Sequence, residues 1–427
     1  MSAMEIRPAS RPLDATVVLP GSKSYTNRAL LIAAMAQGGS VLRQASFSDD
    51  TDYMAQALRT LGIQVEEDRQ QAEFQVAGAG GSIPVREASL FVGNAGTAAR
   101  FLTGFVALGH GTYTIDGAPR MRQRPIQPLL DGLFQLGVKA YAKQGNGCPP
   151  VVVVAAGLPG GRASIRGDIS SQYFTAILMV APLSEQGVTL EVVGDLVSKP
   201  YLDMTASTMR AFGAEMDNEG YQRFVVPGGQ RYLSRAYDIE PDASGASYFF
   251  AAAAVTGGRV RVEHLGGDSA QGDLRFVEVL ERMGCTVTQG ADFTEVAGPA
   301  QLHGVDADMG DISDTAQTLA AIAPFADGPV TIRNIAHVRA KESDRVAATA
   351  TQLRRLGLQV DERPDGLTVH PGAMHAADIE TYDDHRMAMS FAVTGLRAPG
   401  IRIKDPDCVS KTFPDFWERF GKLFLPL

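Results

Sequence analysis

Six segments of the sequence begin with residues that could bind an anion and then continue as alanine-rich, apolar stretches that predict helices. The free N–H groups and partial positive charge of a helix start favour phosphate or carboxylate. Cations in a first helical turn oppose the helix dipole, so those in these segments predict an anionic partner. For Asp242 and Ser244, simple helix capping is the favoured interpretation. The segments carry Lys23, Ser24 and Arg28; Asn94, Gly96 and Arg100; Ser170, Ser171 and Gln172; Asp242, Ser244 and Ser247; Asp314; and Asp384, His385 and Arg386.

Four polar loops between these segments also concentrate cations. One such loop could be an ordinary solvated surface, but four loops in phase with the helix starts favour a small polyanionic substrate. The loops carry Arg120, Arg122 and Arg124; Ser198, Lys199 and Tyr201; Arg339, Lys341, Glu342 and Arg345; and Lys411.

The elements that must position these side chains recur along the chain. Glycines at intervals of 71 to 76 residues each follow a predicted helix and precede a β-prone segment, as expected of a left-handed helix cap. These glycines are Gly62, Gly137, Gly213, Gly284 and Gly357, with a weaker copy expected at Gly421. The six helix starts recur in the same phase. The 427 residues therefore predict six units of about 71 residues, each with a helix, a strand, a polar loop, a second helix and a hairpin of strands.

Folding of these units in threes predicts two α/β domains. One domain would span residues 21–240, and the other residues 241–427 completed by residues 1–20. Residues 4–20 read as strands that the sixth unit lacks, so we expect the N-terminus to pair with the C-terminal units. The crossings near residues 20 and 240 would act as hinges, with the active site in the cleft between the domains.

Composition and charge exclude several classes of protein. Hydrophobic residues at 45% and charged residues at 20% exclude collagen and general disorder. The net charge of -9 argues against a nucleic-acid or anionic-membrane partner. Three widely spaced cysteines signal neither a disulfide framework nor a zinc site. Because a signal peptide and a long apolar run are not recognisable, a soluble cytoplasmic protein is expected. The absence of the motif GxxxxGK followed by Ser or Thr argues against an ATP-binding P-loop.

A series of motifs, in order and over nearly the full length, resembles the enolpyruvyl transferase family. Within it, the motifs resemble the branch that makes 5-enolpyruvylshikimate-3-phosphate. They are LPGSKSYTNRALL, GNAGTAAR, PRMRQRPI, GDISSQYFTAILM, LVSKPYLD, DASGASYF, VRAKESDR, YDDHRMAM and KTFPDF. The resemblance implies an inside-out α/β barrel fold of two globular domains, each of three repeated α/β units.

The resemblance also implies the reaction and the residues that serve it. The enolpyruvyl group of phosphoenolpyruvate would pass to the 5-hydroxyl of shikimate-3-phosphate through a tetrahedral adduct, with release of phosphate. No cofactor or metal is implied. The implied catalytic residues are Lys23, Asp314 and Glu342. The implied contacts of shikimate-3-phosphate are Lys23, Ser24, Arg28, Ser170, Ser171, Gln172, Ser198, Tyr201, Asp314, His337 and Lys341. Those of phosphoenolpyruvate are Lys23, Asn94, Gly96, Arg124, Gln172, Arg345, His385, Arg386 and Lys411.

Two positions depart from the family pattern, and two other functions stay open. His337 stands where many relatives carry Asn, and Phe101 stands where a Pro is often found.

The related enzyme that acts on UDP-N-acetylglucosamine uses a cysteine in one loop. The corresponding loop here reads GAPRMRQRP and contains no Cys. A non-catalytic scaffold that binds an anionic metabolite would not need Asp314 or Glu342. A monomer is expected.

Overall fold

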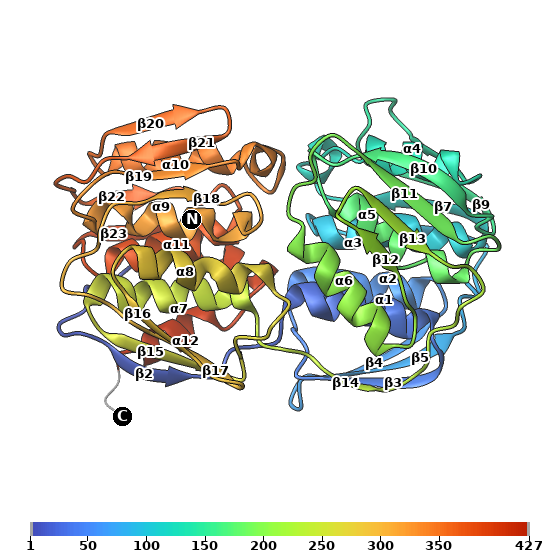
Figure 1. Ribbon diagram of the computed structural model, residues 1–427, viewed down its shortest axis with the longest axis horizontal. Coiled ribbons are helices and arrows are strands. Elements are labelled where there is room, and N and C mark those ends of the chain that lie inside the picture. The colour runs from blue at the N-terminus through green and yellow to red at the C-terminus, as the bar shows by residue number, and fades with distance from the viewer. Residues whose placement is uncertain (1–2, 425–427) are drawn as a thin grey trace. The chain divides into compact units, whose positions relative to one another are not determined.

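The computed structural model describes residues 3–424, and the outer bounds predicted at residues 1–2 and 425–427 lie outside this part. The chain divides into two compact units (Figure 1). One is Gly21–Glu240, and the other consists of residues 3–20 and 241–424.

The unit Gly21–Glu240, all of whose residues are described, alternates inner and outer helices. The inner helices α1, α3 and α5 are buried almost throughout, because apolar side chains cover most of their sides. Close packing of α3 on α5 needs Gly104, where an added Cβ would lie 2.3 Å from the carbonyl oxygen of Ala176. The helices are α1 (Lys23–Met35), α2 (Asp49–Thr60), α3 (Gly96–Phe105), α4 (Gln127–Gln135), α5 (Gln172–Leu178) and α6 (Pro200–Ala211).

Three sheets of four strands complete this fully described unit, with orders β14-β3-β5-β4, β6-β7-β9-β8 and β10-β11-β13-β12. In each, the strand after an inner helix runs parallel to a strand of the preceding repeat and antiparallel to a hairpin strand. Pairing of β14 with β3 closes the three repeats into a ring. The strands are β3 (Gln37–Arg43), β4 (Gln64–Asp68), β5 (Glu73–Ala79), β6 (Glu87–Phe91), β7 (His110–Asp116), β8 (Lys139–Ala142), β9 (Val151–Ala156), β10 (Gly161–Arg166), β11 (Val188–Val193), β12 (Asp217–Glu219), β13 (Arg223–Val226) and β14 (Ala236–Asp238).

The described part of the other unit repeats this plan, with buried inner helices α7, α9 and α11. Its sheets have the orders β2-β15-β17-β16, β18-β19-β21-β20 and β1-β23-β22. Its helices are α7 (Ala243–Thr256), α8 (Phe276–Arg282), α9 (Ala316–Ile322), α10 (Arg345–Arg355), α11 (His385–Gly395) and α12 (Phe416–Lys422). Its strands are β1 (Ala3–Glu5), β2 (Asp14–Val17), β15 (Arg259–Glu263), β16 (Thr286–Gln289), β17 (Phe293–Ala297), β18 (Asp306–Asp308), β19 (Val330–Arg333), β20 (Val360–Arg363), β21 (Gly366–Val369), β22 (Ala377–Ile379) and β23 (Ile401–Lys404).

The N-terminal segment supplies two strands to this second unit. Strand β2 pairs in parallel with β15, and β1 pairs antiparallel with β23, where it takes the place of a hairpin strand. Each helix–strand repeat thus has a sheet on which to bury its apolar face.

The repeated glycines adopt the predicted conformation at five of six places. Gly62, Gly137, Gly213, Gly284 and Gly357 have φ between +87° and +99°, which L side chains rarely adopt. The prediction for Gly421 is wrong. This residue lies inside α12, which continues to Lys422, and it does not have the positive φ of a left-handed cap.

Within the described residues, no helix is long and apolar enough to cross a membrane.

Candidate active site

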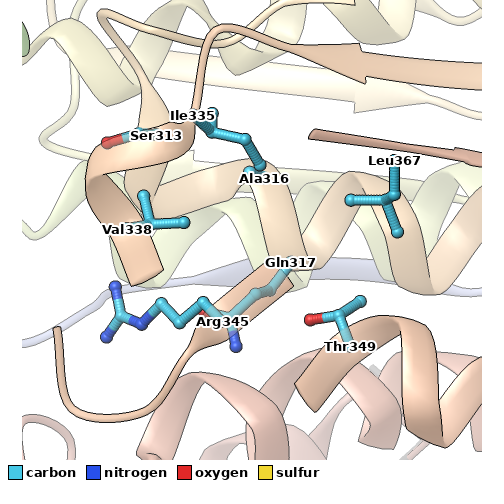
Figure 2. Close-up of a pocket in the computed structure, with 8 residues that line it drawn as sticks. All are labelled: Ser313, Ala316, Gln317, Ile335, Val338, Arg345, Thr349 and Leu367. Atoms are coloured by element: carbon cyan, nitrogen blue, oxygen red, sulfur yellow. The ribbon is translucent and has the colours of Figure 1, made fainter. Parts of the chain in front are cut away.

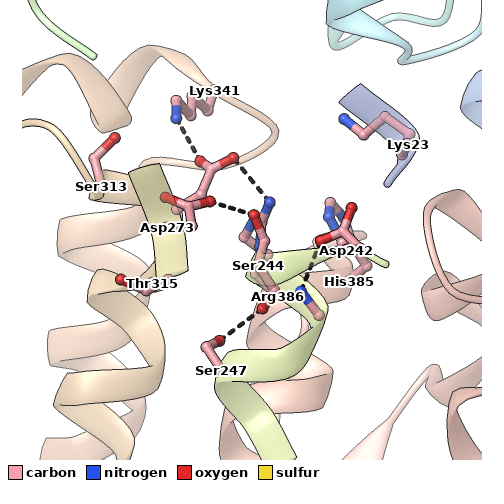
Figure 3. Close-up of polar contacts among 12 residues, drawn as sticks. Lys23, Asp242, Ser244, Ser247, Asp273, Ser313, Thr315, Lys341, His385 and Arg386 are labelled. Atoms are coloured by element: carbon pink, nitrogen blue, oxygen red, sulfur yellow. Dashed lines mark hydrogen bonds and ion pairs between the residues drawn. The ribbon is translucent and has the colours of Figure 1, made fainter. Parts of the chain in front are cut away.

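Asp314 is the centre of a charged cluster in the second unit. It lies in a short 3-10 turn, Ser313–Thr315, directly before α9. Its Oδ1 accepts from Lys341 Nζ at 2.5 Å and from Arg345 Nη1 at 3.0 Å, and its Oδ2 accepts from Arg386 Nη2 at 2.8 Å. Lys341 and Arg386, both labelled in Figure 3, reach this carboxylate from two different elements, the segment before α10 and the start of α11. Burial alone would raise the pKa of Asp314, but the charges of Arg386, Lys341 and Arg345 outweigh it and hold the pKa well below 3.8.

Arg345 links this cluster to two further carboxylates. It is the first residue of α10, and its guanidinium is buried. Nε donates to Asp384 Oδ2 at 2.9 Å, and Nη2 donates to Glu342 Oε2 at 2.8 Å. Burial acts to lower the pKa of Arg345, but the carboxylates of Asp384, Glu342 and Asp314 raise it above its ordinary value. Arg345 is therefore fixed as a cation with its planar fork already oriented.

Asp384 forms hydrogen bonds with two of the predicted binding residues, Arg345 and Arg386. Its carboxylate is fully buried and caps α11 by accepting from the backbone N–H of Arg386 at 3.0 Å. It also accepts from Ser343 Oγ at 2.8 Å, in addition to its bonds with Arg345. One side chain thus fixes both the start of α11 and the fork of Arg345.

Glu342 lies between two cations. Besides its bond with Arg345, it forms an ion pair with Lys411 Nζ at 3.4 Å, and its side chain is 8% exposed. Lys341, the neighbour of Glu342 in sequence, forms an ion pair with Asp314. The sequence order of residues 341–345 did not reveal this, because the turn before α10 points successive side chains in different directions.

Two histidines near the cluster are neutral. Burial first, and then the charge of Lys341, lower the pKa of His337 to about 3, and its Nε2 lies 2.8 Å from Ser313 Oγ. His385 is 1% exposed, and burial followed by the charges of Lys411 and Arg386 lowers its pKa well below 6.5. Neither ring nitrogen of His385 has a hydrogen-bond partner among the described residues. A cationic role for either histidine is therefore disfavoured in the ligand-free protein.

In the unit Gly21–Glu240, Lys23 is the first residue of α1. Its Nζ forms an ion pair with Asp50 Oδ2 at 3.2 Å. Arg28, one turn further, is 1% exposed. Its guanidinium donates to Thr205 Oγ1 and to the backbone oxygens of Ser24 and Tyr201, each at 2.9 Å. Burial lowers the pKa of Arg28 to about 10.

Phe101, one of the two departures from the family pattern, lies within this packing. The guanidinium carbon of Arg28 lies 5.3 Å from the centre of the Phe101 ring.

A second group gathers around the start of α3. Arg124 Nη1 donates to the backbone oxygen and Oδ1 of Asn94, at 2.9 and 3.1 Å. A Cβ added at Gly96 would lie 2.4 Å from Arg124 Nη2, so glycine here makes room for the arginine. Gln172, the first residue of α5, donates to Thr97 Oγ1 at 3.4 Å. Residues from two repeats thus come together with Arg124.

Three serines predicted to contact substrate lie at element starts. Ser170 Oγ accepts from the backbone N–H of Gln172 at 3.3 Å, and Ser171 is the residue before α5. Ser198 has φ +55°, in the left-handed region that non-glycine residues seldom occupy. Such strain is concentrated at functional sites, and Ser198 lies three residues before Tyr201.

Some cations grouped with the predicted site have structural partners instead. Arg100 donates to the backbone oxygens of Gly96 at 3.2 Å and Pro125 at 2.9 Å, so carbonyl dipoles stabilise its charge where an anion was expected. Arg122 is paired with Asp116. Arg339 is paired with Asp344 and Glu362, as expected of a charged surface.

A family model described as EPSP synthase (3-phosphoshikimate 1-carboxyvinyltransferase) matches residues 8–420. The chain belongs to the EPSP synthase family. It is 53% identical to the 3-phosphoshikimate 1-carboxyvinyltransferase of Nostoc punctiforme, with 99% of each chain covered. It is 47% identical to the chloroplastic enzyme of the same name from Solanum lycopersicum, over 96% of this chain and 83% of that one. This EPSP synthase family member is thus a transferase.

The fold class predicted from the repeats is confirmed by a solved relative. The EPSP synthase of Acinetobacter baumannii matches with a TM-score of 0.82 and 25% identity, over 99% of this chain and 98% of that one.

Three residues that support the candidate site of this EPSP synthase family member could not be identified from the sequence. Asp384 was recognised at a helix start but not as a holder of Arg345. Asp50, in the run SFSDDTD, and Ser313, before Asp314, were not singled out. Their short polar side chains are indistinguishable in sequence from ordinary caps, and only their partners reveal a role.

Proposed function

We propose that this chain transfers the enolpyruvyl group of phosphoenolpyruvate to the 5-hydroxyl of shikimate-3-phosphate, giving 5-enolpyruvylshikimate-3-phosphate and phosphate. The observation that carries the proposal is the full-length identity to relatives named 3-phosphoshikimate 1-carboxyvinyltransferase. The reaction is one step of the shikimate pathway to aromatic amino acids.

The charge of the substrates explains the cations of the site. Each phosphate carries about -1.5 to -2 at neutral pH and each substrate also has a carboxylate, so roughly five negative charges must be bound. We assign the phosphoenolpyruvate anion to Lys23, Arg124, Arg345, Arg386 and Lys411. Arginine suits this role because its fork can donate two parallel hydrogen bonds to carboxylate or phosphate.

For shikimate-3-phosphate we assign the serines and Gln172 at the start of α5, with Lys23, Ser24, Arg28, Ser198 and Lys341. Tyr201 would lie against the ring, and His337 would offer a neutral ring nitrogen. The assigned residues come from both units, and the predicted cleft between the units stays a prediction. Small-angle scattering tests it, since compaction on addition of shikimate-3-phosphate is expected.

Two proton transfers define the catalytic roles. Asp314 is the proposed base for the 5-hydroxyl, because it is ionised and set among cations that would also hold the substrates. Lys23 and Glu342 are the proposed groups for proton exchange at the methylene carbon. The positive charge that develops in the transition state would be stabilised by nearby carboxylates.

The related enolpyruvyl transfer to UDP-N-acetylglucosamine is disfavoured by the loop after β7. The cysteines of the chain are Cys148, Cys285 and Cys408, and none of them lies in residues 117–125. The expected cytoplasmic location and monomeric state stay predictions.

The direct test is to mix the purified protein with both substrates and follow phosphate release. Release that requires both substrates, without added metal or nucleotide, is expected. If no phosphate is released, the proposed function is wrong.

Replacing Glu342 with glutamine is expected to lower kcat by a factor of about 10² to 10³, because the amide keeps the shape of the side chain but cannot exchange a proton. Steady-state phosphate release measures this. Glu418→Gln is the matched control, since Glu418 is exposed on α12 and pairs with Lys422. An anion-binding scaffold would show no turnover in the parent protein and therefore nothing to lose.

A further inference from the structure

A small cavity in the second unit is lined in part by Arg345 (Figure 2). It is bordered by the turn before α9 and the start of that helix, by the turn Ala336–Ala340 and the residue before it, by the first two turns of α10 and by strand β21. Four of its eight lining residues are apolar. The lining residues are Ser313, Ala316, Gln317, Ile335, Val338, Arg345, Thr349 and Leu367.

Gln317 is the unsatisfied member of this lining. Its side chain is 3% exposed, and neither its amide oxygen nor its amide nitrogen has a hydrogen-bond partner among the described residues. Ser313 is bonded to His337, Thr349 lies 3.5 Å from Met387 Sδ, and Arg345 is held by carboxylates. A buried amide without partners is costly, and such groups in proteins are usually satisfied by ordered water.

The cavity offers what one water molecule needs. It has room for about one water, and a bound water requires two to four polar partners. The amide of Gln317 can both donate to and accept from it. The hydroxyl of Thr349 lies on the same wall. Arg345 is the first residue of α10. The Asp344 carboxylate accepts from the backbone N–H of Ala347, and its carbonyl oxygen accepts from that of Ala348, so the N–H groups of Arg345 and Val346 are the ones without a partner inside the helix.

We propose that this cavity holds one ordered water molecule that joins Gln317 to the first turn of α10, and that Gln317 thereby acts as a positioning residue for Arg345. The inference rests on the proposed function, in which Arg345 binds phosphoenolpyruvate. The carboxylates fix the outer end of the Arg345 side chain, and the water supports the backbone from which it extends.

The test replaces Gln317 with methionine, which has a similar shape but no amide. A crystal structure of the parent protein at high resolution is expected to show density for one water within hydrogen-bond distance of the Gln317 amide, and Gln317→Met should lose it. KM for phosphoenolpyruvate is expected to rise about fivefold, the effect of one lost water-mediated contact. We expect kcat and KM for shikimate-3-phosphate to stay within about twofold.

Two further variants separate positioning from general packing. Gln317→Asn keeps an amide, and should return KM for phosphoenolpyruvate close to that of the parent. Leu367→Met changes an apolar part of the same wall and should leave both KM values unchanged. Thermal unfolding of each variant identifies any that fold poorly.

Either of two results would overturn the inference: a parent cavity without water density, or a Gln317→Met variant whose two KM values change equally or not at all. If the parent protein shows no turnover, the proposed function fails instead, and the density for the water still decides whether the cavity is hydrated.

Discussion

Replacing Asp314 with asparagine is expected to lower kcat by a factor of about 10² to 10⁴, the range typical of a lost general base. The amide cannot accept the proton of the 5-hydroxyl. The substitution also removes the negative charge that Lys341, Arg345 and Arg386 share. These cations would then bind substrate anions without competition from Asp314. We therefore expect KM for phosphoenolpyruvate to stay the same or to fall while kcat collapses.

The measurement is steady-state phosphate release with each substrate varied in turn. Asp327→Asn is the matched control, because Asp327 is an exposed carboxylate of the same unit that pairs with His303. A kcat within tenfold of the parent would show that Asp314 does not take the proton.

The same three cations determine the pH range in which Asp314 is ionised. Asp314 has a pKa well below 3.8, so it stays ionised from neutral to mildly acid pH. Its contribution to stability is present above its unfolded pKa near 3.9 and is lost only as pH falls through the lower folded pKa. The acid limb of kcat/KM should therefore belong to another group, and Asp314→Asn should leave the position of that limb unchanged. Substrate anions that share Arg345 and Arg386 would raise the pKa of Asp314 toward that of a useful base.

Replacing Arg345 with methionine is expected to lower the free energy of unfolding of its unit by about 3–5 kcal/mol. Methionine keeps much of the apolar stem but removes the buried cation. Asp384, Glu342 and Asp314 each lose a charged partner, and buried charges without partners are strongly destabilising. The loss should come with a large rise in KM for phosphoenolpyruvate.

Urea unfolding followed by tryptophan fluorescence measures this change in one unit. Trp417 is the single tryptophan of the chain, and it lies in α12 of the same unit as Arg345. Arg354→Met, further along α10, breaks an exposed pair with Glu362 and should cost less than about 1 kcal/mol. Equal losses in the two variants would mean that the Arg345 network adds no specific stability.

The order of elements could be predicted because each repeat uses local signals. A glycine cap can be read from a few neighbouring residues, and Gly62 and Gly357 have the positive φ that their place after a helix requires. The prediction for Gly421 was wrong because the same local signal occurs there inside a helix, one residue before the end of α12.

The partners of the charges could not be predicted in the same way. Arg28 bonds to Thr205, 177 residues away, and Arg386 bonds to Asp314, 72 residues away. Arg100 is one such case, since its guanidinium donates to the carbonyl oxygens of Gly96 and Pro125, where an anion was expected.

The sequence by itself therefore determined the sixfold repeat, the fold class, the family and the anionic character of the substrates, because short-range periodicity and residue type carry that information. Only the tertiary structure decided that Asp314 gathers three cations, that Asp384 orients Arg345 and that Gln317 lies unsatisfied beside a cavity. These facts depend on which side chains become neighbours when helix starts from different repeats are packed together, and burial then sets the pKa of each group.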